Sequence, residues 1–241
     1  MGGDLLHRYC IGNLITDIDC ECKRLEKLGK AYESNSTNDA DITFKISDSA
    51  LNELEKKHPE MDRDGLAYFF SGSVFYRKAS LFNAVMLHSS AIMYKGKGYL
   101  FSADSGVGKT THTKLWQKVF GNEVKIINDD KPLIRKIDGQ WMVFGTPWSG
   151  DSDENLNVSV PVGGIIFISR AQTNKIRRLE LYKDEIAQLF LEQTIRAREP
   201  EQAMAVLENA DDLLKSVPVF FLECNTSTDA VMTAYKAIIE E

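Results

Sequence analysis

A lysine and a threonine follow two glycines in the stretch SADSGVGKTTHTKLW, residues 102–116. Phosphate groups are polyanionic, and a glycine-rich turn that opens a helix binds them because its amides and the helix N-terminus converge. Gly106 and Gly108 would let the backbone approach the phosphates. Lys109 would contact the β- and γ-phosphates, and Thr110 would bind Mg²⁺ through its hydroxyl. The stretch therefore predicts a nucleotide-binding loop.

The loop departs from the Walker pattern G-x-x-x-x-G-K-[ST] at one position, where this chain has Ala103. An alanine is tolerated there if the backbone has negative φ, and is harmful if positive φ is required. The loop stands between an expected strand at 99–102 and an expected helix at 110–120, which favours nucleotide binding in spite of the departure. The expected binding residues are Ser105, Gly106, Val107, Gly108, Lys109, Thr110 and Thr111.

Two adjacent acidic residues, Asp129 and Asp130, end the next expected strand at 124–128. Phosphoryl transfer needs a metal near the transferred group and a base that orients the acceptor hydroxyl, and two carboxylates can divide these tasks. The alternative is a solvated turn, because aspartate is a favoured turn residue. The pair is therefore a candidate for both metal binding and catalysis.

His88 lies in the segment LHSSA, before an expected hairpin that leads into the glycine loop. Histidine titrates near neutral pH and can move a proton, which makes His88 a candidate catalytic residue. The alternative is a packed, hydrogen-bonded histidine on an apolar strand. His112, one turn into the helix after the loop, is expected near the nucleotide.

The order strand, loop, helix, strand and Asp-Asp is typical of a nucleotide-binding unit. Expected hairpins on both sides, with turns at 95–98 and 138–139, predict a mixed rather than a parallel sheet. We therefore expect an α/β fold with a mixed β-sheet flanked by helices. Residues 1–70 would form a small α+β N-terminal subdomain, and residues 71–241 the nucleotide-binding kinase domain. Residues 8–19 are expected to form one strand. Residues 72–86 are expected to form a buried helix, with a strand as the alternative because of their aromatic residues.

The composition excludes several classes of function. The chain has 241 residues and a net charge of -6, so no general basic surface is available for nucleic acid. No apolar run reaches membrane-spanning length, and the N-terminus lacks the layout of a secretory signal, so we expect a cytoplasmic protein without membrane partners. Cys20 and Cys22 form a C-x-C pair with no second pair to complete a zinc site. Reduced structural thiols are expected at all four cysteines, with a metal or redox role as the alternative.

Several motifs together resemble the HPr kinase/phosphorylase family. LHSSAIMYKGKGYLFSADSGVGKT is similar to that family's histidine, hairpin and G-[DE]-S-G-x-G-K-[ST] pattern, and VKIINDD to its strand with paired aspartates. The motifs are more similar still to bacterial HPr-kinase-related proteins. The matching segments are residues 87–91, 105–116, 128–132, 145–150 and 157–161.

The resemblance implies the fold that HPr kinase shares with phosphoenolpyruvate carboxykinase, a P-loop on a mixed sheet. It implies that Lys109 contacts phosphate, that Thr110 and Asp130 hold Mg²⁺, and that Asp129 orients a serine hydroxyl. It also places His88 in the active site. Four further residues would line the acceptor side, or alternatively form a structural turn with a buried tryptophan: Thr146, Trp148, Ser149 and Asn157.

Two departures from the family's sequence pattern concern the molecule that accepts the phosphate. The arginine-bearing loop with which HPr kinase handles its protein partner is not recognisable between residues 150 and 160, and Asp151 stands where a lysine is common. HPr and the reverse phosphorylase reaction are therefore not expected. The expected function is an ATP- and Mg²⁺-dependent kinase that transfers the γ-phosphoryl group to a serine hydroxyl of a peptide or small protein. A small-molecule phosphotransferase and a non-catalytic nucleotide-sensing module are the alternatives, and a homo-oligomer is left open.

Overall fold

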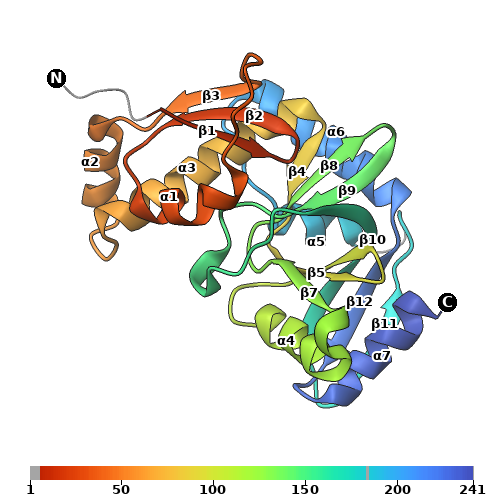
Figure 1. The fold of residues 1–241 in the computed structure, drawn as a ribbon. Coiled ribbons are helices and arrows are strands. Elements are labelled where there is room, and N and C mark those ends of the chain that lie inside the picture. Colours follow the sequence, from red (N-terminus) through yellow and green to blue (C-terminus); the bar gives the residue numbers. More distant parts are fainter. Residues whose placement is uncertain (1–5, 183–184, 241) are drawn as a thin grey trace.

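The computed structural model describes residues 6–182 and 185–240 and contains two β-sheets with helices around them (Figure 1). The smaller sheet has the order β1-β2-β3, with β1 and β2 antiparallel and β2 and β3 parallel. Three helices accompany this sheet. The bounds are β1 Leu6–Ile11, β2 Leu14–Asp19, α1 Lys23–Gly29, β3 Ile42–Lys45, α2 Asp48–Lys57 and α3 Arg63–Ala79.

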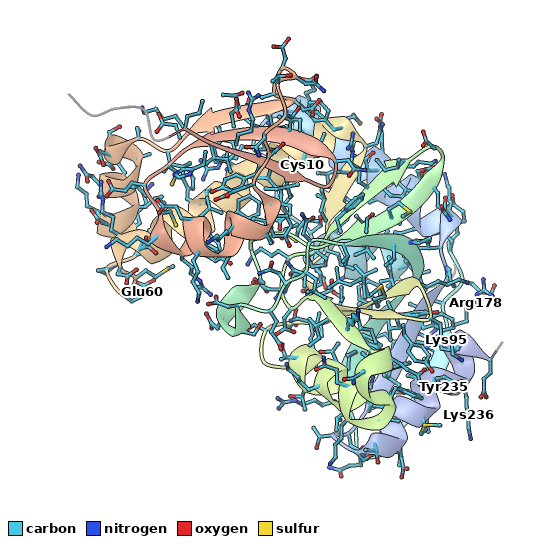
Figure 2. All side chains as sticks on the ribbon, in the orientation of Figure 1. Cys10, Glu60, Lys95, Arg178, Tyr235 and Lys236 are labelled. Carbon is cyan, nitrogen blue, oxygen red and sulfur yellow. The ribbon has the colours of Figure 1, made fainter. Side chains whose placement is uncertain are left out.

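The chain reverses between β1 and β2, where we expected one continuous strand. Gly12 and Asn13 both have positive φ, at 62° and 59°, which is the backbone that a two-residue hairpin turn requires. The prediction of a single strand over 8–19 was therefore wrong. Cys10 lies on β1 at the edge of this sheet (Figure 2). All four cysteines are free of disulfides, and burial raises the pKa of Cys22 to about 11.

The larger sheet has the order β4-β8-β9-β10-β6-β5-β7, and β12 extends it by pairing with both β10 and β11. β10 runs parallel to β6 and β12 but antiparallel to β9, so the sheet is mixed, as predicted. The bounds are β4 Ala84–Met86, β5 Ser89–Tyr94, β6 Lys97–Ser102, β7 Lys125–Asn128, β8 Leu133–Ile137, β9 Gln140–Phe144, β10 Ser159–Arg170, β11 Lys175–Arg178 and β12 Val219–Cys224.

Alternation along β10 divides the core between the two faces of this sheet, because successive side chains of a strand point in opposite directions. Ile165 and Phe167 pack with residues of α5 (Ile186–Glu192) and α6 (Pro200–Ser216). Ile166 and Ile168 pack with residues of α4 (Lys109–Phe120) and α7 (Thr228–Ile239). Lys95 of the β5–β6 turn lies beside Tyr235 of α7, at 3.5 Å (Figure 2). The sheet is thus covered by one pair of helices on each face.

Helix α3 connects the two sheets. The side chain of Asp62 caps it by accepting a hydrogen bond from the Gly65 amide at 2.7 Å. The helix ends at Ala79, and Asn83, with φ 55°, directs the chain into β4, so the helix expected over 72–86 begins earlier and stops sooner. The expected domain boundary at residue 70 falls inside α3. One hydrophobic cluster also runs from the smaller sheet through α3 to Leu133, Phe144 and Trp148.

Four short 3-10 helices complete the described chain: η1 Lys30–Tyr32, η2 Ser80–Phe82, η3 Gly121–Glu123 and η4 Gly150–Ser152. Among the described residues, no helix has both the length and the apolar character needed to cross a membrane.

Candidate active site

The glycine loop stands between β6 and α4, as expected, with α4 beginning at Lys109. Gly106 and Gly108 have positive φ, at 79° and 126°, and open space surrounds both, so the backbone conformation rather than crowding requires glycine. Ala103 is buried at the end of β6 and does not have positive φ. Because the φ angle of Ala103 is not positive, an alanine is tolerated at this position of the loop.

Lys109 is folded back onto the loop. Its ammonium donates to the carbonyl oxygens of Ala103 and Asp104, at 2.9 and 3.4 Å. Burial lowers the pKa of Lys109, and the nearby carboxylates of Asp130, Asp104 and Asp129 act against that effect. A phosphate at the loop would have to replace these carbonyl oxygens as the partner of the ammonium.

Asp129 is buried at the end of β7, and both of its carboxylate oxygens accept hydrogen bonds from hydroxyl groups. Ser90 donates to Oδ1 at 2.6 Å, and Thr110 donates to Oδ2 at 3.0 Å. The Ser90 hydroxyl also lies 2.8 Å from that of Thr113 on α4. We expected Thr110 to share a metal with Asp130, but the structure brings the Thr110 hydroxyl to Asp129.

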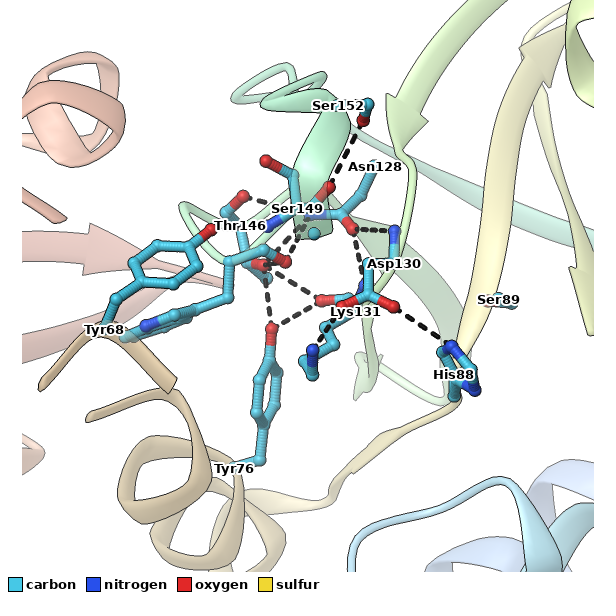
Figure 3. A network of polar contacts seen from close by, with 12 residues as sticks. Tyr68, Tyr76, His88, Ser89, Asn128, Asp130, Lys131, Thr146, Ser149 and Ser152 are labelled. Carbon is cyan, nitrogen blue, oxygen red and sulfur yellow. Dashed lines mark hydrogen bonds and ion pairs between the residues drawn. The ribbon is translucent and has the colours of Figure 1, made fainter. Parts of the chain in front are cut away.

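Asp130 lies beside His88 and Lys131 (Figure 3). Nε2 of His88 is 3.1 Å from Oδ1, and the ammonium of Lys131 contacts Oδ2. Burial alone would raise the pKa of Asp130, but the hydrogen bond from His88 and the charge of Lys131 lower it to about 2. This carboxylate is therefore ionised at neutral pH.

Gln193, next to the end of α5, connects this pair to the glycine loop. Its Oε1 is 3.1 Å from Nδ1 of His88, and its Nε2 donates to Oδ1 of Asp104 at 2.7 Å. Its backbone oxygen accepts a hydrogen bond from the His88 amide at 2.8 Å. Sequence reasoning missed Gln193, because no local pattern links it to residues so far away along the chain.

The four residues expected on the acceptor side lie elsewhere. Thr146, Trp148 and Ser149 are buried, and the Asn157 amide donates to the carbonyl oxygen of Ala31 at 2.7 Å. The Thr146 hydroxyl lies 2.8 Å from that of Tyr76, and the Trp148 indole donates to Ser71 at 3.1 Å (Figure 3 shows part of this network). None of these four side chains is among those that line the cleft. Their contacts fit the alternative of a structural turn with a buried tryptophan.

A cleft of about 560 Å³ brings the other expected residues together. One wall holds the glycine loop, His88, Asp129 and Asp130, and the short helix η4 contributes Asp151 to the lining. The opposite wall comes from the N-terminal part of the chain, which sequence reasoning did not place here. Its residues are Arg24, Met61, Gly65, Tyr68 and Phe69.

The N-terminal part also holds η4 in place. The guanidinium of Arg24 lies 4.3 Å from the centre of the Tyr68 ring and donates to Asp153 at 2.9 Å. The Tyr68 hydroxyl donates to the carbonyl oxygen of Pro147 and accepts from the Ser149 amide, both at 2.9 Å. Both walls of the cleft are therefore joined through the segment at 147–153.

The donor set suits Mg²⁺ bound together with a nucleotide. Among residues 6–182 and 185–240, no group of three or more His, Cys, Asp or Glu side chains could hold a metal ion. Mg²⁺ in phosphate-transferring sites usually takes only one or two carboxylates, with substrate phosphates and water completing its shell. The oxygens of Thr110 and Asp129, 3.0 Å apart at the end of the glycine loop, fit that requirement.

The fold and cleft define an α/β protein with a curled mixed sheet. A family model described as "SynChlorMet cassette protein ScmC" matches residues 56–233, and the chain belongs to this family. No curated protein matches the chain. Among solved structures, the HPr(Ser) kinase/phosphatase from Coxiella burnetii is similar, with 12% identity and a TM-score of 0.38 over 64% of this chain and 97% of that one. This likeness is distant and supports no assignment of function.

Proposed function

We propose that this protein is an ATP- and Mg²⁺-dependent kinase that transfers a γ-phosphoryl group to a serine hydroxyl of a peptide or small protein. The observation that carries the proposal is the convergence of Lys109, Thr110, Asp129, Asp130 and His88 on one cleft. Phosphoryl transfer needs phosphate binding, charge neutralisation and a positioned acceptor, and the cleft offers groups for all three.

The phosphates of the donor would lie at the glycine loop. Lys109 would turn from the carbonyl oxygens of Ala103 and Asp104 to the β- and γ-phosphates. Thr110 and Asp129 would hold Mg²⁺, since their oxygens already lie together beside the loop. The bound ion would neutralise charge on the β- and γ-phosphate oxygens.

The acceptor would approach from the side of His88 and Asp130. The hydroxyl oxygen would form a bond to the γ-phosphorus as the bond from that phosphorus to the β–γ bridging oxygen breaks. Asp130 would accept a hydrogen bond from the hydroxyl and later its proton, and His88 would hold the carboxylate in position. This assignment exchanges the roles expected for the two aspartates, and it follows from the position of Thr110.

A peptide or protein acceptor is favoured over a free metabolite by the wall opposite the loop. Phe69 is 55% exposed and Met61 37% exposed, and both lie at the cleft. Such exposed apolar side chains suit the flanking side chains of a polypeptide, whereas a small polar metabolite would leave them in water. The wall therefore supports a serine within a chain as the acceptor.

The test is transfer of label from ATP carrying radioactive γ-phosphate, in the presence of Mg²⁺. The acceptor panel contains serine peptides, the same peptides with alanine in place of serine, and free hydroxylated metabolites. Label on serine peptides only is the expected result, and Lys109→Ala should abolish it. The matched control is Lys118→Ala, an exposed lysine on the same helix. Label on metabolites alone would favour the small-molecule enzyme, and ATP binding without any transfer would favour the sensing module.

A further inference from the structure

Asp151 is a charged residue of the cleft whose carboxylate has no hydrogen bond or ion pair with any residue that the structure describes. It is exposed and lies in η4, on the lining of the cleft. Asp129 and Asp130, which also line the cleft, each have two polar partners. The charge of Asp151 is therefore available to a group of the substrate.

The short helix η4 packs directly against Asp130. Gly150 has a φ of 66°, and a Cβ at this position would lie 2.8 Å from the Cβ of Asp130, closer than such atoms approach. Glycine is required here both by the backbone conformation and by this close contact. Because Asp151 is the next residue, it lines the cleft beside the aspartate that is proposed to accept the serine proton.

Arg24 holds the segment on both sides of Asp151. Its guanidinium donates to the carbonyl oxygen of Gly150 and to the carboxylate of Asp153, the latter at 2.9 Å. Lys27 adds a contact to Asp153 at 3.0 Å. Arg24 attracts Asp151 electrostatically, but its hydrogen bonds go to the other two residues. Asp151 is thus held in place by its neighbours, while its carboxylate stays open to a cation from outside the chain.

Apolar surface for the stem of a basic side chain lies in the same cleft, where Met61 and Phe69 are exposed. Lysine and arginine bury their methylene groups on apolar surface and keep the charged end in a polar environment. A cation also packs favourably on an aromatic ring, as the Lys131 ammonium does 5.6 Å from the centre of the Phe69 ring. A carboxylate and apolar surface in one cleft suit a basic side chain better than an acidic one.

We propose that Asp151 selects acceptor polypeptides that carry a lysine or an arginine close to the phosphorylated serine in sequence. The cation would pair with Asp151 while the serine hydroxyl reaches Asp130. The inference rests on the proposed function in one respect, that the acceptor is a serine within a polypeptide. It goes beyond that function because it names the sequence class of the acceptor and the residue that recognises it.

The experiment measures kcat/KM for phosphorylation of serine peptides that differ at one position near the serine, where each carries lysine, glutamate or alanine. The readout is the ratio of kcat/KM for the lysine peptide to that for the glutamate peptide within one variant, so a general loss of activity cancels. Asp151→Asn removes the charge at nearly the same volume, and Asp151→Lys reverses it. Glu123→Lys changes the net charge by the same amount and is the control, because Glu123 is exposed on η3 outside the cleft lining.

The unmodified protein should favour the lysine peptide about tenfold at one or more positions, because attraction of one peptide and repulsion of the other each contribute a few-fold. Asp151→Asn should remove most of this preference, Asp151→Lys should abolish or reverse it, and Glu123→Lys should keep it. The preference should also weaken at high salt.

Equal values for the lysine and glutamate peptides in the unmodified protein would overturn this inference and leave the proposed function standing. The same holds if the preference for lysine persists in Asp151→Lys, or if Asp151→Asn loses transfer to every peptide, since a selecting residue is not needed for transfer itself. Absence of transfer to any peptide by the unmodified protein would overturn the proposed function and this inference with it.

Discussion

The hydroxyl of Thr110 donates a hydrogen bond to Asp129 at 3.0 Å, whereas the neighbouring Asp130 is held by His88 at 3.1 Å. The two adjacent carboxylates therefore face different partners. Asp129 faces Thr110 on the helix after the glycine loop and Ser90 on β5, whereas Asp130 faces His88, which lies between β4 and β5. This separation gives each aspartate its own test.

Asp129→Asn should weaken the response to Mg²⁺, because it removes the carboxylate next to the Thr110 hydroxyl. Half-saturation of ATP binding should need about tenfold more Mg²⁺ or higher, within the usual range for groups that support a metal site. Asp130→Asn should bind ATP and Mg²⁺ normally but transfer at least about a hundredfold more slowly, the effect typical of a general base. Magnesium titrations and single-turnover transfer measure the two effects. The opposite pattern would restore the roles expected from the sequence.

Ser90 is expected to position Asp129, since its buried hydroxyl lies 2.6 Å from the carboxylate and 2.8 Å from Thr113. Ser90→Ala should lower the free energy of unfolding by about 1–3 kcal/mol, because it leaves buried polar groups without a partner. It should also raise the Mg²⁺ requirement. Ser89→Ala is the matched control, because the neighbouring Ser89 donates only to the carbonyl oxygen of Leu87. Urea denaturation and the same magnesium titration would show both effects, and equal behaviour of the two variants would argue against a positioning role.

Because the pKa of Asp130 is lowered in the folded protein, the free energy of unfolding should depend on pH in a known direction. The partners of Asp130 lower its pKa from 3.8 to about 2 in the folded protein. A carboxyl group with a lowered pKa stabilises the fold above its unfolded-state pKa, and that stabilisation is lost as the pH falls through the folded-state value. The unfolding free energy of the native protein should therefore exceed that of Asp130→Asn by about 1–2 kcal/mol at pH 6. The difference should shrink between about pH 4 and pH 2, measured by urea denaturation at each pH; a constant difference would contradict the ion pair.

Local sequence patterns predicted the groups on one wall of the cleft. The glycine loop, the strand before it and the helix after it are set by short-range signals, and so is the position of Asp129 and Asp130 at the end of β7. The mixed sheet also followed from the expected hairpins. The reversal at Gly12 and Asn13 was missed because apolar residues continue on both sides of it.

The second wall could not be predicted, because it depends on contacts between distant segments. Arg24 reaches Asp153, and Tyr68 reaches Pro147 and Ser149, only after α3 has packed against the larger sheet. No periodicity in the N-terminal residues indicates that they face a phosphate loop. The contact of Thr110 with Asp129 could not be predicted either. From the sequence, Asp129 and Asp130 are equally good partners for Thr110, and only the folded strand fixes the direction of each side chain.

Phe69 should contribute to acceptor binding without affecting the donor, because it is exposed at the cleft opposite the glycine loop. Phe69→Ala should raise the KM for a serine peptide about tenfold, the loss expected for one apolar contact of this size, with the KM for ATP unchanged. Leu81→Ala is the control, an exposed apolar residue outside the cleft lining. Steady-state kinetics with each substrate varied in turn would separate the effects, and an unchanged peptide KM would remove α3 from the acceptor site.

Gln193 should act as a positioning residue, because its amide lies between His88 and Asp104 and can act on the proposed base, Asp130, only through His88. Gln193→Leu keeps a similar volume but removes both hydrogen bonds, so His88 loses the contact that orients its ring toward Asp130. We expect kcat to fall about tenfold with little change in the KM for ATP, since a misoriented acceptor group slows transfer without weakening donor binding. Gln188→Leu, an exposed residue on α5 outside the cleft lining, is the matched control. Gln193→Asn has a shorter side chain and cannot span both partners, so it should behave like Gln193→Leu. A rise in the KM for ATP with unchanged kcat would instead mean that Gln193 serves the glycine loop through Asp104.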